Sequence, residues 1–423
     1  MKCLFIYPCP TESKHYRFGF SINIAYLSAI LKMKLSSDNY FFDLSCQNLS
    51  LDYIVDFIEK RQIDLVLIDF DSYSLKRAEN SISGLELTDS IKAKTNAKII
   101  AFGHLCSIKQ QKIANADYTC MSDPRFSICQ IITNFFPQLK IEDVNSYDEL
   151  PLPDRDLINQ IPYYKTNSHC NLIQTSQGCL NGCSFCQRRA WFDEYRTHSI
   201  EYVISEFQDL KSRGVKNLWV VDDNFSFNLN RAKRLLKSLI ETGLTEGMYI
   251  ALSSWINIDH EFLDLASKAN VKVMSFGLEN GSQKVLDFYN KNITRDKISD
   301  IIFYANSKGI FTVGNFIIGS PIETIDMVNE NFAFIESLKL DQVNIKILDY
   351  MVGSPLFDTL PKVMKDNNDH YFSCKENGLS NISIDNLIRL KKKFLSENYK
   401  KSQERLKAKI VKFGVPYLPI KNT

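Results

Sequence analysis

The chain has 423 residues, with 51 Lys and Arg against 49 Asp and Glu, and a formal net charge of +2. This length exceeds what one hydrophobic core usually supports, so two or more domains are expected. The near-neutral charge gives no electrostatic reason to expect nucleic acid or an anionic membrane as a required partner. The sequence shows no apolar run long enough to cross a bilayer, so no membrane span is predicted.

The start of the chain and its cysteines predict a cytoplasmic location. Met1 and Lys2 lead directly into the apolar run Cys3–Tyr7, which is too short for the apolar core of a secretory signal and is typical of a buried strand. Eleven cysteines without such a signal indicate reduced thiols and metal chemistry rather than a disulfide framework. We therefore expect a cytoplasmic protein that requires anaerobic handling.

Strand and helix patterns alternate through the first third of the chain. Five such units in a row predict a Rossmann-like, doubly wound parallel α/β sheet over residues 1–140. Its ligand crevice would lie at the carboxyl ends of the strands, near Pro8–Pro10, Asp71–Tyr73 and Gly103–His104. The predicted strands are Lys2–Tyr7, Tyr40–Leu44, Asp64–Phe70, Ala97–Phe102 and Asp117–Met121, and the predicted helices are Ser21–Leu35, Leu51–Arg61, Ser81–Lys94 and Phe126–Phe136.

A proline-punctuated stretch separates this domain from the next. The segment Glu149–Arg155 reads Glu-Leu-Pro-Leu-Pro-Asp-Arg, which can continue neither a helix nor a central strand. The surrounding residues have weak hydrophobic periodicity. We therefore predict a linker over residues 141–167.

The alternation then resumes with longer units and predicts a partial (β/α)6 barrel of the TIM type over residues 168–360. In such barrels the loops that follow the strands carry the chemistry. Residues 361–423 are predicted to form a helical, Lys-rich C-terminal region in which Lys391–Lys393 is a solvated helix face. The predicted strands are Asn171–Thr175, Asn217–Val221, Met248–Ser253, Val271–Gly277, Phe311–Ile318 and Gln342–Leu348, and the predicted helices are His198–Ser212, Asn230–Thr242, Glu261–Lys268, Arg295–Lys308 and Thr324–Leu338.

Three cysteines, Cys179, Cys183 and Cys186, form a Cys-x3-Cys-x2-Cys pattern directly after the first predicted barrel strand. Three thiolates on one loop can hold three irons of a [4Fe-4S] cluster and leave the fourth iron open to bind and reduce a small molecule. A structural zinc site would require four ligands, usually as two pairs, and no second Cys-x2-Cys pair exists, although His169 and Cys170 lie upstream. A loop that merely buries its cysteines is the other alternative.

At this motif the chain resembles the radical S-adenosylmethionine (SAM) superfamily, whose pattern also places an aromatic residue at Phe185. The resemblance implies that SAM binds to the open iron and is cleaved reductively to a 5'-deoxyadenosyl radical. That radical would abstract a hydrogen from an unactivated position of a small-molecule or peptide substrate, in a barrel that excludes water. It also implies an external electron donor such as flavodoxin or ferredoxin.

Residues after later strands match segments that bind SAM in this superfamily. Asp222 and Asp223, after the second strand, would bind the methionyl ammonium by charge-assisted hydrogen bonds. Glu279 and Ser282, after the fourth strand, would contact the ribose hydroxyls. The alternative in both places is a polar turn that caps the next helix.

The order of the domains resembles the cobalamin-binding subgroup of the superfamily over roughly residues 1–350. That resemblance implies methyl transfer through cobalamin, with Gly103 in the cobalamin crevice. No Asp-x-His-x-x-Gly motif marks a cobalt ligand, and His15 and His104 are the histidines of this domain. The open alternative is a vestigial first domain that shapes the substrate pocket of a cobalamin-free enzyme, which would catalyse rearrangement, epimerisation, coupling or oxidation.

Two other classes stay open. A methylthiotransferase also joins an α/β domain to this barrel and holds a second cluster on three cysteines at strand ends. Here Cys9 and Cys106 follow the first and fourth strands, but the third strand ends in Asp71–Tyr73 and Cys46 follows the second. A non-enzymatic iron-sulfur scaffold would not need carboxylates and glycines at successive strand ends.

Basic residues follow the cysteine motif, at Arg188, Arg189 and Arg196. They could hold a carboxylate or phosphate, but we interpret them as a solvated basic loop. Neither they nor the neighbouring aromatic residues identify the substrate.

Overall fold

The computed structural model describes residues 1–8, 19–70, 77–109, 112–166, 171–191, 194–366, 373–374 and 379–413. The chain divides into two compact units, one built mainly from Met1–Ile173 with Thr197–Tyr202, the other mainly from Gln174–Arg196 and Val203–Asn367 with the C-terminal region. Each unit has its own parallel sheet, so the predicted α/β fold class is confirmed. Several residues named above lie outside the described ranges: Cys9, Pro10, His15, Asp71–Tyr73, His169 and Cys170.

The first unit is built on a five-stranded parallel sheet with the order β2-β1-β3-β4-β5. All five residues of β3 are buried, as expected for a parallel strand covered on both faces. The strand order changes direction between β1 and β3, and ligands of such sheets bind outside the carboxyl ends at that point. The strands are β1 Lys2–Tyr7, β2 Asp38–Asp43, β3 Leu65–Asp69, β4 Lys98–Phe102 and β5 Tyr118–Thr119.

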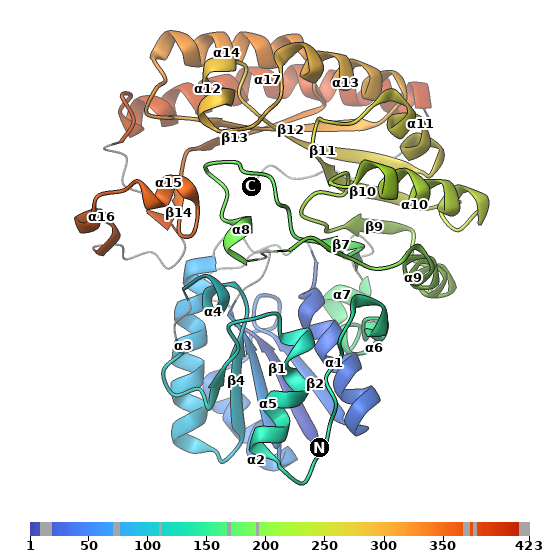
Figure 1. Ribbon diagram of the computed structural model, residues 1–423, viewed down its shortest axis with the longest axis vertical. Coiled ribbons are helices and arrows are strands. Elements are labelled where there is room, and N and C mark those ends of the chain that lie inside the picture. Colours follow the sequence, from blue (N-terminus) through green and yellow to red (C-terminus); the bar gives the residue numbers. More distant parts are fainter. Residues whose placement is uncertain are drawn as a thin grey trace. The chain divides into compact units, whose positions relative to one another are not determined.

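Helices cover both faces of this sheet, with α2 and α3 on one side and α1 and α5 on the other (Figure 1). Ser21 starts α1 by accepting a hydrogen bond from the backbone N–H of Ile24, and its hydroxyl donates to the Asp69 carboxylate at 2.6 Å. The first helix is thereby tied to the end of β3. The helices are α1 Ile22–Leu35, α2 Leu51–Arg61, α3 Arg77–Lys94, α4 His104–Lys109 and α5 Ile128–Phe135.

The proline-punctuated stretch after the first sheet contains short helical turns. Asp154, at the start of one of them, accepts a hydrogen bond from the Ser28 hydroxyl of α1 at 2.6 Å, and its backbone N–H donates to the Ala25 carbonyl. This part of the predicted linker therefore packs on the first unit. The turns of this stretch are η2 Tyr147–Glu149, α6 Arg155–Ile158 and α7 Pro162–Thr166, and the turn η1 Pro124–Phe126 lies earlier, directly before α5.

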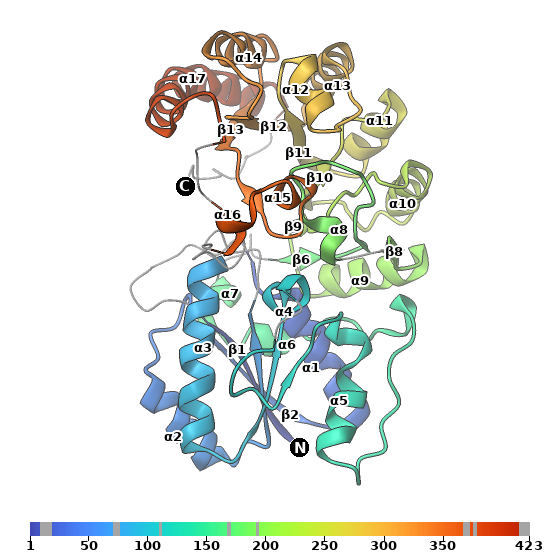
Figure 2. The same ribbon diagram turned by 60° about the vertical axis from the view of Figure 1, so that its left-hand side comes forward.

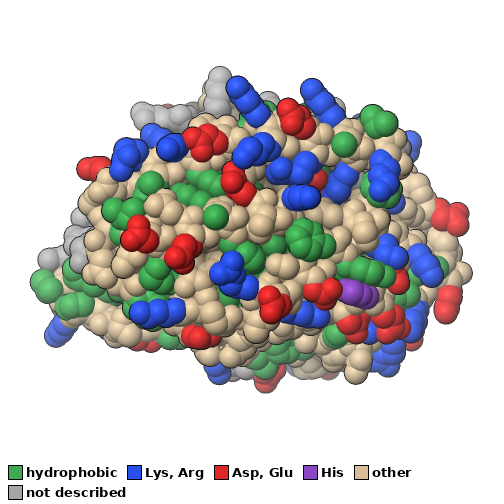
Figure 3. Space-filling model, turned by 90° about the horizontal axis from the view of Figure 1, so that it is seen from above, with side chains coloured by type: hydrophobic (Ala, Val, Ile, Leu, Met, Phe, Trp, Pro, Cys, Tyr) green, Lys and Arg blue, Asp and Glu red, His purple; other side chains and the backbone are tan. Residues whose placement is uncertain are grey.

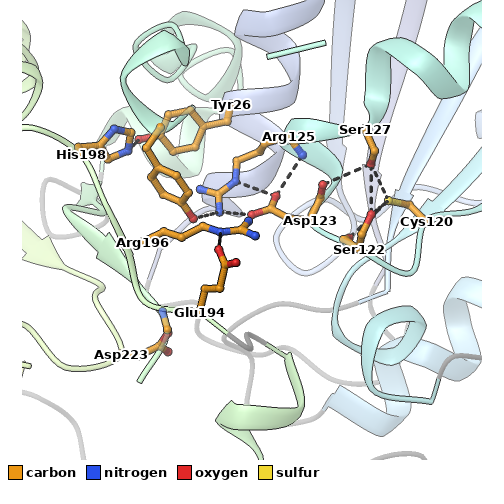
Figure 4. A network of polar contacts seen from close by, with 12 residues as sticks. Tyr26, Cys120, Ser122, Asp123, Arg125, Ser127, Glu194, Arg196, His198 and Asp223 are labelled. Atoms are coloured by element: carbon orange, nitrogen blue, oxygen red, sulfur yellow. Dashed lines mark hydrogen bonds and ion pairs between the residues drawn. The ribbon is translucent and has the colours of Figure 1, made fainter. Parts of the chain in front are cut away.

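A buried arginine organises one side of the first unit (Figure 4). The Arg125 guanidinium forms an ion pair with Asp123 at 2.6 Å and donates to the Tyr147 hydroxyl at 2.9 Å. It also lies 5.5 Å from the ring centroid of Tyr26. The Arg125 side chain has no exposed surface, so its charge is stabilised by protein groups such as these and not by water.

Replacing Arg125 with Met is expected to lower the free energy of unfolding by about 3–5 kcal/mol, because it leaves Asp123 as a buried charge without its cation. Urea denaturation measures the change. As the matched control, Arg213→Met breaks the exposed helical pair with Asp209 and should cost less than about 0.5 kcal/mol. If the two variants unfolded with equal free energies, the Arg125 network would not support the first unit.

The second sheet has six strands with the order β13-β12-β11-β10-β9-β6, of which β9 to β13 belong to the second unit. Each strand lies beside the next strand of this sheet in the sequence, and the strands from β9 to β13 all pair in parallel. Helices follow the strands on the outside of the sheet, which gives the predicted partial barrel (Figure 2). The strands are β6 Leu172–Ile173, β9 Asn217–Val220, β10 Tyr249–Ser254, β11 Val271–Glu279, β12 Phe311–Ile318 and β13 Gln342–Ile347.

Polar residues set the starts of the barrel helices. Asn228, Asp259, Thr294 and Thr324 each accept a hydrogen bond from the backbone N–H three residues later. The cap of the helix after β9 is thus Asn228, and Asp222 and Asp223 are left for other contacts. The helices are α9 Ile200–Ser212, α10 Leu229–Glu241, α11 His260–Lys268, α12 Gln283–Phe288, α13 Arg295–Ser307 and α14 Ile325–Ser337.

A 30-residue helix, α17 (Ile384–Phe413), completes the second unit. Arg405 donates to the Leu340 carbonyl at 2.6 Å, and Lys409 forms an ion pair with Asp341, so these basic side chains anchor the helix beside β13. Lys392 and Lys393 are exposed. Figure 3 shows Lys and Arg side chains spread over the face seen from above. Shorter elements precede α17: β14 Tyr350–Met351, α15 Pro355–Asp358, α16 Lys362–Asp366 and β15 Ser373–Cys374.

In the described part of the chain, no helix is both long enough and apolar enough to span a bilayer.

Candidate functional site

The three cysteines lie on one loop of the second unit. The loop starts after β7 (Ser176–Gln177), which pairs with β8 (Arg196–Thr197), and it ends at α8 (Arg188–Trp191). Gly178 opens it with a φ of +88°, a conformation that favours glycine. The thiols of Cys179, Cys183 and Cys186 are all free, and within the described residues no three His, Cys, Asp or Glu side chains converge on a single metal ion. A [4Fe-4S] cluster does not require convergence on one point, because each cysteine binds a different iron.

Asp223 joins the two ends of the cysteine loop. One carboxylate oxygen accepts a hydrogen bond from the backbone N–H of Gly178 at 2.9 Å, and the other forms an ion pair with Arg188 at 2.9 Å. The backbone N–H of Arg188 in turn donates to the Cys186 sulfur at 3.5 Å. Asp223 therefore fixes the loop where it begins and where it ends.

Asp222 holds the strand that leads into the loop. Its carboxylate accepts hydrogen bonds from the Thr175 backbone N–H at 2.7 Å, and from the Thr175 and Ser176 hydroxyls at 2.6 Å each. Burial raises the pKa of this carboxyl, while these donors and the Ser176 backbone oppose the rise. A carboxylate has about four acceptor positions, so Asp222 is close to saturated by its own chain.

The middle of the loop rests on a turn that follows α12. The Ser184 backbone N–H donates to the Tyr289 carbonyl at 3.0 Å, and the Asn290 amide donates to the Gly182 carbonyl at 2.8 Å. The Phe185 ring meets the Tyr289 ring edge to face, with centroids 5.2 Å apart. The segment 288–290 thus supports the loop through hydrogen bonds and a ring contact within the chain, which need no bound group.

The next residue of that turn, Lys291, is a buried cation beside the cysteines. Its amine forms an ion pair with Glu279 at 2.8 Å and lies 6.0 Å from the Phe185 ring centroid. Burial raises the pKa of all three cysteine thiols, to about 12 for Cys183, and Lys291 opposes that rise at each thiol. The site therefore supplies a positive charge where thiolates must form for metal binding.

Ser282 occupies the N-cap position of α12, but its side chain makes no capping hydrogen bond. Glu279, three residues earlier, ends β11 with its carboxylate on Lys291. The structure thus brings Cys179, Cys183, Cys186, Phe185, Asp223 and Glu279 to the carboxyl edge of the second sheet, as predicted from their places after the strands. Their roles toward a cofactor stay predictions.

Gly103, the candidate residue of the first unit, follows β4 and has a φ of +111°. His104 begins α4 directly after it. The parallel register of β1, β3 and β4 brings Pro8, Phe70 and Gly103 to the same edge of the sheet. This edge belongs to the first unit, and the cysteine loop belongs to the second.

Two contributors to the cysteine site were missed by the sequence interpretation. Arg188 was assigned to a solvated loop, whereas its ion pair with the nearly buried Asp223 makes it part of the loop's anchorage. Lys291 sits between two asparagines in what looks like a surface turn, and nothing in the local sequence marks it as buried. Arg189 is exposed and Arg196 pairs with the exposed Glu194, in agreement with a solvated loop there.

Comparison with known proteins finds a matching domain and a number of curated relatives. Residues 173–335 match the Radical SAM superfamily. An uncharacterized methyltransferase of Pyrococcus horikoshii is 30% identical over 218 residues, which cover 51% of this chain and 47% of that protein. The ribosomal protein uS12 methylthiotransferase RimO of Clostridium novyi is 30% identical over 212 residues, which cover 48% of this chain and 46% of that protein. The chain thus spans less than half of either relative's length.

Among solved structures, the radical SAM methyltransferase TsrM of Kitasatospora setae has a similar fold. It matches with a TM-score of 0.70 over 84% of this chain and 73% of its own, at 15% identity. That structure has cobalamin and a [4Fe-4S] cluster bound, and another contains tryptophan as substrate with a SAM analogue. At this identity the likeness concerns the fold.

Proposed function

We propose, from the radical SAM domain that residues 173–335 form, that this protein is an enzyme that cleaves SAM and functionalises an unactivated C–H bond of a small-molecule or peptide substrate. The observation that carries the proposal is the anchored loop with three free thiols after the first barrel strand. A [4Fe-4S] cluster bound there would supply the electron for reductive cleavage of SAM, which it would receive from an external donor such as flavodoxin or ferredoxin. We infer methyl transfer through cobalamin as the form of the reaction.

The donor set fits a cluster that has one open iron. Cys179, Cys183 and Cys186 would each hold one iron, and Asp223 and the 288–290 turn keep their loop in place. Lys291 offsets part of the thiolate charge. The chain's own residues therefore position the thiols before any group is bound, as preorganised sites do.

We propose that Asp223 and Glu279 bind SAM directly. Asp223 is engaged by two donors, Gly178 and Arg188, and its remaining acceptor positions suit the methionyl ammonium. Glu279 uses one oxygen for Lys291, and we propose that the second accepts a ribose hydroxyl and that Ser282 is a further ribose contact. Asp222, saturated by Thr175 and Ser176, would act by holding the strand.

Asp223→Asn and Glu279→Gln are each expected to weaken SAM binding about tenfold or more, because a lost hydrogen bond to a charged group costs roughly 1.5–3 kcal/mol. Equilibrium binding of SAM under anaerobic conditions measures the change, and iron analysis of the same samples shows whether the cluster is retained. Glu261→Gln, an exposed glutamate paired with Lys233 and Lys237, is the control. Unchanged SAM affinity in both variants would leave Asp223 and Glu279 with structural roles alone.

The first unit is proposed to hold cobalamin at the edge near Gly103, without a histidine ligand to cobalt from this chain. Support comes from the change of strand order between β1 and β3 and from the fold shared with TsrM, whose structure contains cobalamin. Should no cobalamin bind, the same barrel would catalyse a cobalamin-free radical reaction, and the first unit would shape the substrate pocket.

A methylthiotransferase is the second candidate, favoured by the similarity to RimO. The strand order argues against the second cluster that this activity would need. Cys46 follows β2 and Cys106 follows β4, three strand spacings or about 14 Å away across the sheet. Cys106 is also buried in the hydrophobic core, where burial and the nearby Cys120 raise its pKa.

Anaerobic reconstitution tests the proposal. Iron, sulfide and cobalt are quantified together with the visible spectrum, and SAM cleavage to 5'-deoxyadenosine is measured with dithionite as reductant. We expect about four irons and four sulfides per chain and reductant-dependent cleavage of SAM. A protein that takes up about one zinc per chain and does not cleave SAM would contradict it.

A further inference from the structure

The ion pair between Lys291 and Glu279 is nearly fully buried and lies next to the turn that supports the cysteine loop. The side chains are 3% and 8% exposed. The Lys291 amine also lies 4.6 Å from the Trp255 ring centroid. A buried pair of this kind contributes little net stability compared with apolar residues, so its presence calls for another role.

The backbone around the pair is arranged to accommodate it. Glu279 has a φ of +61°, in the left-handed region that is strained for a glutamate, and the register of β11 with β12 shifts between Gly277 and Glu279. At Gly277 a Cβ atom would stand 2.5 Å from the Glu279 carboxylate and 3.1 Å from the Lys291 amine. The strand therefore bends, and Gly277 leaves room, so that this carboxylate reaches this amine.

The pair faces the cysteine loop on the side where the loop is supported. Lys291 directly follows Tyr289 and Asn290, which hydrogen-bond to Ser184 and Gly182 of the loop. The other ion pair at the loop, between Arg188 and Asp223, lies at its ends. Lys291 lowers the pKa of the Cys183 thiol, and Glu279 raises it by a smaller amount. At Cys183 the positive charge of the pair thus outweighs the negative one.

We propose that Lys291 is a positioning residue that sets the reduction potential of the cluster held by Cys179, Cys183 and Cys186, with Glu279 limiting its effect. The inference rests on the proposed function and deepens it. Reduction adds one negative charge to the cluster. A fixed cation in a water-poor site favours the reduced state and raises the potential, and a fixed anion lowers it.

Redox titration of the reconstituted protein, followed by the electron paramagnetic resonance (EPR) signal of the reduced cluster without SAM, tests this directly. Lys291→Gln should make reduction at least tenfold less favourable, which is a shift of about 59 mV to more negative potential for one electron. Glu279→Gln should shift the potential in the opposite direction. The double variant should lie between the two.

Opposite shifts distinguish a charge effect from a general loosening of the site, which would let in water and move both variants the same way. Lys308→Gln, which breaks the partly exposed pair with Asp264, controls for the loss of a distant charge and should leave the potential unchanged. If the Lys291→Gln variant does not retain the cluster, the direction of the potential shift in Glu279→Gln alone tests the inference. Shifts in the same direction, or none, would overturn the inference. Wild-type protein without a cluster would instead refute the proposed function.

Discussion

Single replacement of Cys179, Cys183 or Cys186 by Ala is expected to abolish cluster assembly and SAM cleavage. Each thiolate would hold one iron, and the loop is anchored by Asp223 and the 288–290 turn, so it cannot easily present another ligand. Iron and sulfide content after anaerobic reconstitution, with the visible spectrum, measures the loss.

Cys129→Ala is the matched control for these variants. Cys129 is also a free cysteine and, like Cys183, it is buried, but it lies on α5 of the first unit. The control should retain wild-type iron content and SAM cleavage. A triple-alanine variant of the loop that still bound about four irons and cleaved SAM would place the cluster elsewhere in the chain.

Gly103→Trp is expected to abolish cobalamin uptake and to leave the [4Fe-4S] cluster in place. The backbone at the end of β4 must pass close to a large ring if cobalamin lies at this edge, and an indole would fill that space. Hydroxocobalamin binding to wild type and variant, read from the visible spectrum, measures the effect.

The φ of +111° at Gly103 strains any side chain, so the variant needs a control for the turn itself. Gly103→Ala carries the same backbone penalty with little added volume, and it should keep most of the cobalamin uptake. An equal loss of cobalamin uptake in both variants would mean that backbone strain in the turn, and not the volume of the side chain, prevents binding. Wild-type protein that takes up no cobalamin would rule out the methyl-transfer form of the reaction and leave the cobalamin-free form.

The fold could be predicted from sequence because both sheets are parallel. Their strands are short apolar runs and their helices amphipathic or apolar stretches of ordinary length, so alternation alone indicates the class. β1, α2 and β12 have the predicted bounds. The short helices α4, α6, α7 and α12 were not predicted, because four to six residues carry too little periodicity to be distinguished from a turn.

The parts of the candidate site that directly follow strands could be predicted from the sequence. The parts that depend on contacts between distant residues could not. The cysteine spacing and the position after β6 identified the loop. The contacts of Asp222 with Thr175 and Ser176, by contrast, join residues 46 and 47 positions apart. The ion pair of Glu279 with Lys291 depends on a bend in β11 that no local pattern signals. Charged residues in turns look solvated in sequence, and only their neighbours in space show otherwise.

The EPR spectrum of the anaerobically reconstituted, dithionite-reduced protein, recorded with and without SAM, tests the central claim most directly. Three cysteine ligands leave one iron open, so we predict a reduced [4Fe-4S] signal that changes when SAM binds to that iron. A signal that SAM leaves unaltered would mean that all four irons are already ligated, and the absence of a cluster signal would mean that the loop binds none. Either result would contradict a SAM-cleaving site at Cys179, Cys183 and Cys186.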